Sequence, residues 1–294
     1  MTSIALIINT HSGAGSKEKE LEALIKTVTY SQFSLIPFNA KQIKSIVRKL
    51  SEEGYTTIVA GGGDGTVSAI AGAITDLGLH VKLAVLPLGT FNHFARDIGM
   101  PLTLPEALDV IVKGKTTYID IGKVNDTYFI NNSSLGLYPK IVKYREEFRR
   151  KGWHKGLAFI GACIAILKKN TSLTIEFDLD NKKTSKRGQF IFIGNNKYEM
   201  VGLLSIGQRK YLDQGVLSLC IAKDVSNLKL LSFGLHALTG TLVEQKDFNV
   251  VGLTECIISS KKSLIDVSHD GEISPMKAPL HYQILPKALL IIIP

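Results

Sequence analysis

The chain has few of the residues that mark secreted or membrane-spanning proteins. It has three cysteines, Cys163, Cys220 and Cys256, and no CxxC pair, so neither a disulfide framework nor a structural zinc site is indicated. Its longest apolar run, residues 157–167, is well short of the roughly 20 residues that cross a bilayer. The N-terminal residues lack the charged start of a signal peptide. We therefore expect a cytoplasmic protein from a reducing compartment.

The composition is that of an ordinary globular protein. Of the 294 residues, 45% are hydrophobic and 21% are charged, which argues against a disordered or collagen-like chain. The length fits one large domain or two smaller ones.

The excess positive charge lies almost entirely in the second half of the chain. Residues 1–125 carry 12 Lys and Arg against 11 Asp and Glu, whereas residues 126–294 carry 23 against 15. Residues 140–155 alone hold seven Lys and Arg against two Glu, with Tyr144, Phe148 and Trp153 between them. Such a segment can attract an anionic membrane surface or a nucleic acid, or it can be a solvated helix face.

Strand and helix patterns alternate along the first 125 residues. Short apolar runs predict strands over 3–8, 57–60 and 82–86. Apolar residues at helical spacing predict helices over 16–28, 43–50, 67–74 and 106–112. This alternation predicts a doubly wound domain with a parallel sheet and helices on both faces.

The second half has a different pattern. Short β-rich runs separated by turn residues predict an antiparallel sandwich or open barrel. The runs are 117–124, 128–131, 173–177, 189–193, 216–221, 255–258, 264–267, 280–285 and 289–293, with helical patterns near 138–168 and 226–242. We place the boundary near Asp126, which gives domains 1–125 and 126–294.

Two glycine-rich loops follow predicted strands. They are Asn9–Gly15 and Gly61–Thr66. Glycines let backbone N–H groups approach phosphate oxygens, and a helix start behind the loop adds positive charge. Both loops are expected at one edge of the sheet, where ligands bind. The other interpretation is two tight turns, but Asp64 disfavours it: a carboxylate repels phosphate unless a metal or proton-bearing group lies between.

Two further segments carry polar residues suited to chemistry. Pro87–Asp97 follows a predicted strand and, with the two loops, would form the third wall of a nucleotide cleft; alone, it could be a capped helix start. In Asp270-Gly271-Glu272, one carboxylate could accept the proton of an attacking alcohol. In an extended segment both carboxylates would share a face. Alternatively, Asp-Gly marks an exposed hairpin turn.

Together, GGGDGT, the Asn9–Gly13 loop, PLGTFNHFA and Asp270-Gly271-Glu272 resemble the diacylglycerol kinase catalytic-domain family, which includes bacterial lipid kinases, sphingosine kinases and ceramide kinases. The resemblance covers nearly the whole chain. It implies a doubly wound N-terminal domain, a β-sandwich C-terminal domain, and transfer of the γ-phosphoryl group of ATP, with Mg²⁺, to a hydroxyl of a diacylglycerol- or sphingoid-like lipid.

The resemblance also implies roles for individual residues. Asp64 is expected near the metal, and Asp270 or Glu272 as the base, with His269 as the next candidate. The implied nucleotide-binding residues are Asn9, Thr10, His11, Ser12, Gly13, Gly62, Gly63, Asp64, Gly65, Thr66, Val67, Ser68 and Thr90.

The chain departs from the family pattern in several places. Thr10 replaces a usual Pro, Ser68 a usual Asn, and His93 an Asp found in some relatives. Bacterial relatives hold a structural magnesium in an L-x-x-D-G-x-L stretch, which implies a site at Tyr211, Gln214 and Val216 here. Gln214 stands where the ligand Asp would be, and a neutral amide binds Mg²⁺ more weakly than a carboxylate. Asp213 is offset from that position by one residue.

Two other functions stay open at this stage. GGDGT is shared with NAD kinases, and the departures are compatible with a non-catalytic lipid- or nucleotide-binding protein on the same scaffold. For partners, we expect a lipid substrate and an anionic membrane surface, with peripheral association, and no nucleic acid; a homodimer is left open.

Overall fold

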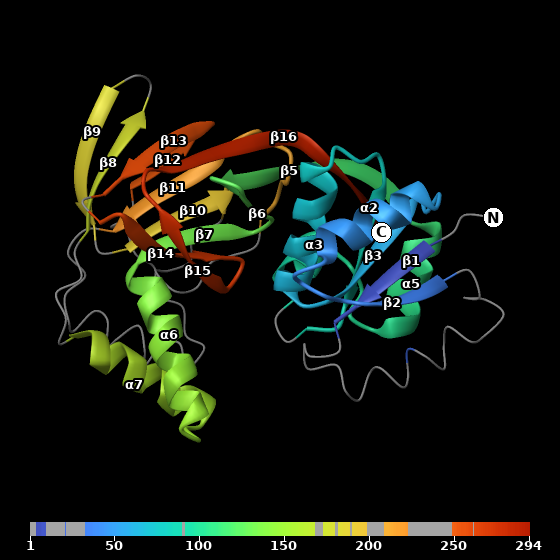
Figure 1. The fold of residues 1–294 in the computed structure, drawn as a ribbon, viewed down its shortest axis with the longest axis horizontal. Helices are drawn as coiled ribbons and strands as arrows, with labels where there is room; N and C mark the ends of the chain where they lie inside the picture. The colour runs from blue at the N-terminus through green and yellow to red at the C-terminus, as the bar shows by residue number, and fades with distance from the viewer. Residues whose placement is uncertain are drawn as a thin grey trace. The chain divides into compact units, whose positions relative to one another are not determined.

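A computed structural model describes residues 4–9, 21, 33–89, 92–167, 173–179, 182–188, 190–198, 209–222, 249–260 and 262–294. The chain divides into two compact units (Figure 1). The first comprises Met1–Ile121, Thr127–Asn131 and Leu285–Pro294, and the second Gly122–Asp126 and Asn132–Ile284. The C-terminal residues thus belong to the first unit, which the sequence did not predict. The boundary at Asp126 stays a prediction.

The first unit is built on a parallel sheet. Its strands lie in the order β2-β1-β3-β4, with β1 Ile4–Ile8, β2 Phe33–Pro37, β3 Thr57–Gly62 and β4 Lys82–Pro87. Every residue of β1 and β3 is buried, as expected for strands of a parallel sheet covered on both faces. The helices are α2 Ile43–Glu52, α3 Asp64–Asp76, α4 His93–Asp97 and α5 Leu104–Lys113. The α/β prediction for this half is confirmed.

Helix α2 shows why the periodicity was informative. Its buried residues, Ile43, Val47 and Leu50, recur at one face of the helix while its lysines face solvent. The predicted helix at 16–28 lies outside the described residues except for Leu21, which is helical and buried.

The second unit is an antiparallel β-structure. Its strands form two sheets. One has the order β12-β11-β10-β7-β14-β15, and the other contains β16, β13, β8 and β9 in that order. Ser133 on β7 and Tyr282 on β16 join the two sheets through hydroxyl groups 2.9 Å apart. Burial raises the pKa of the Tyr282 phenol. The predicted sandwich is therefore confirmed.

The strands of the second unit are short. Five of the nine given next match predicted runs, whereas the strands at 132–136, 182–188, 249–253 and 272–277 were not predicted. The nine are β7 Asn132–Gly136, β8 Leu173–Leu179, β9 Lys182–Gly188, β10 Phe190–Asn195, β11 Leu217–Ala222, β12 Asn249–Leu253, β13 Glu255–Ser259, β14 Leu264–His269 and β15 Glu272–Lys277. Helices α6 (Leu137–Arg150) and α7 (Lys155–Leu167) lie where helical patterns were predicted. The predicted helix at 226–242 lies outside the described residues.

Strand β16 differs from the prediction. The sequence predicts two strands, 280–285 and 289–293, but the structure has one, Leu280–Ile293. Lys287 adopts a left-handed φ of 50° within it, and its N–H donates to Asp120 Oδ1 at 2.8 Å. Asp120 is completely buried in β5 (Lys115–Val124), which pairs with β16 and with β6 (Thr127–Phe129). The buried Asp120 carboxylate thus accepts the hydrogen bond of the backbone N–H of Lys287, and β16 continues past this irregular residue.

None of the helices in the described ranges is long and apolar enough to cross a membrane.

Candidate nucleotide-binding and catalytic site

Asn9, the residue of the first glycine-rich loop that the structure describes, contacts the second loop at the carboxyl ends of β1 and β3. Asn9, directly after β1, donates from Nδ2 to Thr66 Oγ1 at 2.9 Å, and its backbone N–H donates to the Gly61 carbonyl at 2.9 Å. The two loops are therefore joined by hydrogen bonds, as the parallel sheet predicts. Thr10, His11, Ser12, Gly13 and Thr90 lie outside the described residues, so their predicted nucleotide contacts stay predictions.

The second and third loops touch through their backbones. A Cβ atom on Gly89 would lie 2.4 Å from the Cα of Gly63 and 2.8 Å from Asn92 Oδ1. On Gly62, a Cβ would lie 2.6 Å from Thr66 Oγ1. No side chain fits at Gly62 or Gly89 without displacing its neighbours. Gly89 therefore lets the second and third loops approach each other, whereas Gly62 makes room for the Thr66 side chain within the second loop.

Asn92 closes the third loop. Its Nδ2 donates to the Gly89 carbonyl at 2.9 Å, and its Oδ1 accepts from the Gly89 N–H at 3.0 Å. Its left-handed φ of 51° is one that asparagine tolerates better than most residues. Because the Asn92 side chain bonds Gly89, it does not cap α4, the helix that Asn92 precedes.

Asp64 supplies that missing cap. It is the first residue of α3, and its carboxylate accepts from the N–H groups of His93 at 3.2 Å and Phe94 at 3.0 Å. Asn131 Nδ2 approaches Asp64 Oδ1 at 3.4 Å. The sequence argument explained this carboxylate by a metal or a proton-bearing group between it and the phosphates. That argument is incomplete, because the carboxylate also has a structural role. An ionised carboxylate has about four acceptor positions, so these bonds leave room for a cation as well.

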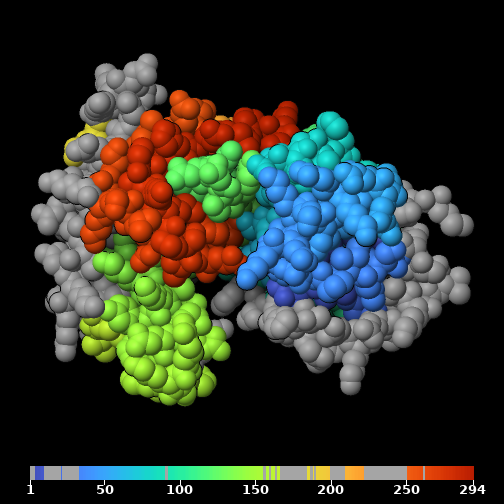
Figure 2. Space-filling view, in the orientation of Figure 1, coloured from blue at the N-terminus to red at the C-terminus, as the bar shows by residue number. Residues whose placement is uncertain are grey.

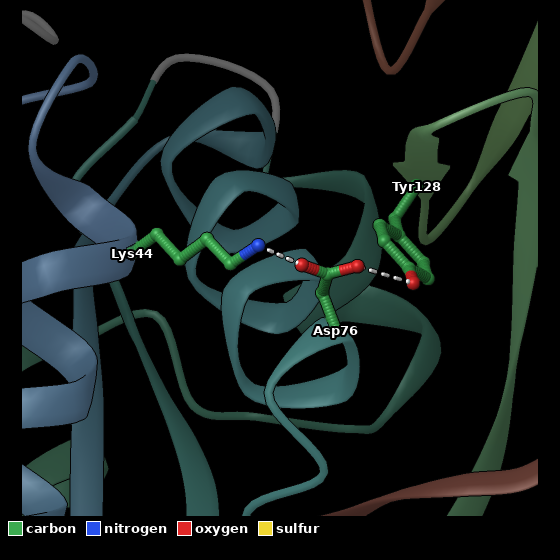
Figure 3. A network of polar contacts seen from close by, with 3 residues as sticks. All are labelled: Lys44, Asp76 and Tyr128. Atoms are coloured by element: carbon green, nitrogen blue, oxygen red, sulfur yellow. Dashed lines mark hydrogen bonds and ion pairs between the residues drawn. The ribbon is translucent and has the colours of Figure 1, made fainter.

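Residues Thr127–Asn131 follow helix α3 from its C-terminal to its N-terminal end. At the C-terminal end, the Tyr128 hydroxyl donates to Asp76 Oδ1 at 3.0 Å, and Lys44 pairs with the other Asp76 oxygen (Figure 3). In mid-helix, Ser68 Oγ donates to the Tyr128 carbonyl at 3.4 Å. At the N-terminal end lies Asn131.

These contacts position a residue that sequence reasoning missed. Asn131 is only 4% exposed and holds the Asp64 carboxylate from a segment 67 positions away in the chain. The available signal was the polar run Asn131–Ser134 among β-rich residues, since buried polar side chains in strands need partners.

In the second unit, Asp270 and Gly271 form the two-residue turn between β14 and β15. Both have positive φ, 45° and 86°, as in type I′ turns, for which Asp-Gly is favoured. The extended conformation that would place Asp270 and Glu272 on one face is therefore not found. The hairpin-turn interpretation is correct for the backbone.

The turn nevertheless holds one of the two carboxylates in place. Asp270 Oδ1 accepts from the Asn132 N–H at 3.0 Å, and the Asp270 N–H donates to the Asn132 carbonyl at 2.9 Å. The Glu272 side chain is exposed and forms no hydrogen bond or ion pair within the described part of the chain. His269 Nε2 lies 3.0 Å from Ser274 Oγ. Among the candidate bases, Asp270 is therefore the carboxylate whose orientation the protein fixes.

In the stretch predicted to bind magnesium, Gln214 and Val216 form hydrogen bonds with other residues of the protein. Gln214 Oε1 accepts from the Lys197 N–H at 3.3 Å, and the Val216 carbonyl accepts from the Asn196 N–H at 2.9 Å. The Gln214 N–H donates to Asn196 Oδ1 at 2.9 Å. Two of the three groups that the resemblance assigns to a metal thus already accept from backbone N–H groups. Tyr211, the third predicted position, has its ring 5.5 Å from Lys210 Nζ.

A buried arginine reinforces the same loop. Arg209 is 3% exposed, donates to the Asn195 carbonyl at 3.2 Å and lies 5.2 Å from the centre of the Tyr198 ring. Within the described ranges, no three His, Cys, Asp or Glu side chains are grouped so as to hold a metal. Tyr211, Gln214 and Val216 supply no carboxylate, the ligand that a hard ion such as Mg²⁺ prefers, and the metal site at these residues stays a prediction.

Comparison with known proteins agrees with this architecture. The family model described as the diacylglycerol kinase catalytic domain matches residues 3–124, and the YegS C-terminal NAD kinase beta sandwich-like domain matches residues 140–293. The chain therefore belongs to the diacylglycerol kinase family of lipid kinases that carry a YegS-type C-terminal domain.

Individual relatives are distant but extend over most of the chain. A diacylglycerol kinase of Staphylococcus aureus is 28% identical over 263 residues, which are 85% of this chain and 82% of that protein. An uncharacterized protein of Synechocystis sp. is 28% identical over 98% of this chain and 70% of its own length. A crystal structure of a Bacillus anthracis diacylglycerol kinase superposes with a TM-score of 0.71 at 19% identity, covering 100% of this chain and 97% of that one. At that identity the structure shows a shared fold alone.

Proposed function

We propose that this protein is an ATP-dependent lipid kinase that phosphorylates a hydroxyl of a diacylglycerol- or sphingoid-like lipid. The observation that supports this proposal most directly is the junction of three loops at one sheet edge. There, Asn9 bonds Thr66, Gly63 touches Gly89, and Asp64 bonds His93 and Phe94.

The nucleotide phosphates are proposed to bind at the start of α3. The Asp64 and Gly65 N–H groups begin this 13-residue helix and have no intrahelical acceptor. The helix dipole adds partial positive charge there. The Mg²⁺ that accompanies ATP would be held by Asp64, and it would neutralise phosphate charge. Because Asp64 is already fixed by two N–H groups, it would meet the nucleotide without reorganisation.

The acceptor hydroxyl needs a base. In the proposed reaction, its oxygen bonds to the γ-phosphorus, the bond from that phosphorus to the ADP oxygen breaks, and the hydroxyl proton passes to a carboxylate. Asp270 is the candidate, since the Asn132 N–H fixes its side chain. That hydrogen bond orients the carboxylate that would accept the proton.

A second candidate is a non-catalytic binding protein on the same scaffold. It is favoured by the structural work that Asp64 does as the cap of α4, which gives this residue a reason to be present without chemistry. The same contacts also serve a kinase, so only turnover separates the two functions.

The test is a phosphorylation assay with γ-labelled ATP and a panel of acceptors. Diacylglycerol, ceramide and sphingosine would be presented in mixed micelles, and NAD would be included as a soluble acceptor. Label transfer to at least one lipid is expected. Transfer to NAD alone would replace the proposal with an NAD kinase, and ATP binding without transfer to any acceptor would favour the binding protein.

A further inference from the structure

We propose that helices α6 and α7, with the turn 151–154 between them, form a docking surface for an anionic lipid bilayer. We call this surface the α6–α7 hairpin. Figure 1 shows the two helices side by side, standing out from the strands of their own unit, and Figure 2 shows α6 as a separate lobe. The proposal concerns binding only and holds whether or not the protein is a kinase.

The turn of the hairpin is held in a fixed shape. The rings of Phe148 and Trp153 lie 4.8 Å apart, and the Trp153 N–H donates to the Phe148 carbonyl at 3.1 Å. A Cβ atom on Gly161 of α7 would lie 3.2 Å from the Trp153 ring and 3.3 Å from the Phe148 ring. Trp153 is therefore anchored on one side by both helices, while 47% of it is exposed.

The charges of α6 leave a net positive surface. Its two acidic residues are already engaged, Glu146 with Arg145 at 3.1 Å and Glu147 with Lys151 at 2.8 Å. Lys143, Arg149 and Arg150 are exposed and form no ion pair with any residue in the described ranges. Arg145 and Lys151 are paired with the two glutamates, so these three cations are the ones that we propose to meet the bilayer.

Apolar side chains are also exposed on the α6–α7 hairpin. Besides Trp153, Leu157 is 59% exposed and Ile164 is 44% exposed. Leu157 and Ile164 are seven positions apart on α7, so they lie on one face of that helix. Sequence reasoning singled out neither residue, because a helix that is apolar on all sides does not show which of its faces is exposed.

The combination favours a membrane over other anionic partners. Exposed cations and exposed Trp, Leu and Ile side chains on one helical hairpin match a bilayer interface, where anionic headgroups overlie an apolar layer. A nucleic acid offers phosphates but no comparable place for aliphatic side chains. Apolar exposure alone would fit a second copy of the chain, but the exposed cations would then face their own counterparts.

The single tryptophan of the chain makes the test direct, because all tryptophan emission comes from Trp153. The full chain, without ATP, would be mixed with vesicles of phosphatidylcholine alone or with 30% phosphatidylglycerol. We expect a blue shift and quenching by brominated acyl chains only with the anionic vesicles, weakened by added salt. An unchanged emission while the protein co-sediments with vesicles would place the contact elsewhere and overturn the proposal.

A charge-matched pair of variants separates local from net charge. K143Q/R149Q/R150Q should lower vesicle affinity on the order of 100-fold, since each cation near such a surface contributes about a fivefold effect. The control K41Q/K262Q/K277Q removes the same charge from exposed sites outside the hairpin and should change affinity little. Equal losses in both would show a net-charge effect and contradict the proposal.

L157S/I164S changes two exposed apolar side chains. It should weaken vesicle binding relative to the wild type, and the difference should be clearest at high salt, where the contribution of charge is screened. A wild-type emission shift that depends on protein concentration without vesicles would identify a second copy as the occupant instead. Failure of any of these tests leaves the kinase proposal standing, because the mixed-micelle assay does not require the hairpin to bind an anionic surface.

Discussion

At the scale of single residues, Asp64 has two roles. Its carboxylate closes the contact between the second and third loops, and it begins the helix proposed to bind phosphate. A side chain with this double role cannot be removed without some structural cost. Loss of activity on mutation is therefore informative only beside a measurement of stability.

We expect Asp64→Ala to lower the free energy of unfolding by about 1 kcal/mol, the usual cost of a lost helix cap, with the protein still folded. Asp64→Asn should cost less, because its amide oxygen can still accept one of the two N–H groups. Urea denaturation followed by circular dichroism would measure both. Equal stability of the wild type and the alanine variant would contradict the capping role.

The two carboxylates of the β14–β15 turn should behave differently. Asp270→Asn keeps an oxygen for the Asn132 N–H and tolerates the left-handed φ, so it should fold normally. As the loss of a general base, it should lower kcat about 10²–10⁴-fold with unchanged ATP affinity. Exposed Glu272→Gln is the matched control and should retain near-normal kcat. The reverse ranking in steady-state kinetics would move the base to Glu272, and two near-normal variants would direct attention to His269.

At the scale of elements, the continuity of β16 depends on a buried side chain of β5. Asp120→Ala leaves the Lys287 N–H without its acceptor, and we expect a loss of about 1–3 kcal/mol in unfolding free energy. Asp109→Ala removes a half-exposed carboxylate paired with Lys113 and should cost under about 1 kcal/mol. Guanidinium denaturation would measure the unfolding free energy of both variants. Equal losses in the two variants would show that Asp120 does not stabilise the strand.

The loop that carries Gln214 should be stable without a metal. We expect the same thermal midpoint for nucleotide-free protein in EDTA and in millimolar Mg²⁺, because hydrogen bonds from Gln214, Asn196 and Arg209 already hold this loop. Arg209→Met should lower the midpoint equally in both buffers. A midpoint several degrees higher in Mg²⁺ than in EDTA would show that a structural ion binds after all.

At the scale of the whole molecule, the sequence predicted what depends on local pattern. The buried runs of β1 and β3 and the spacing of Ile43, Val47 and Leu50 follow from periodicity, as does the position of the glycine loops at strand ends. The Asp-Gly turn was also readable, since that dipeptide suits two positive φ values. These features need only neighbours in the chain.

The contacts that the sequence could not predict join distant segments. Asn131 reaches Asp64 across 67 positions, Asn132 reaches Asp270 across 138, and Lys287 reaches Asp120 across 167. Each depends on packing that brings two elements together, and no spacing rule encodes it. For the same reason, the sequence could not distinguish Asp270 from Glu272, nor show which cations of α6 were already paired.

The central claim is phosphoryl transfer that depends on Asp64, and one measurement tests it most directly. Wild type and Asp64→Ala would be compared for transfer of label from γ-labelled ATP to lipid acceptors in mixed micelles, at a temperature where both are folded. We predict labelled lipid phosphate from the wild type and a loss of at least about 10²-fold in the variant, since the variant would lack the ligand of the Mg²⁺ that neutralises phosphate charge, and electrostatic stabilisation of this kind contributes that much. Equal turnover by the two proteins, or no turnover by the wild type with any lipid, would contradict the account.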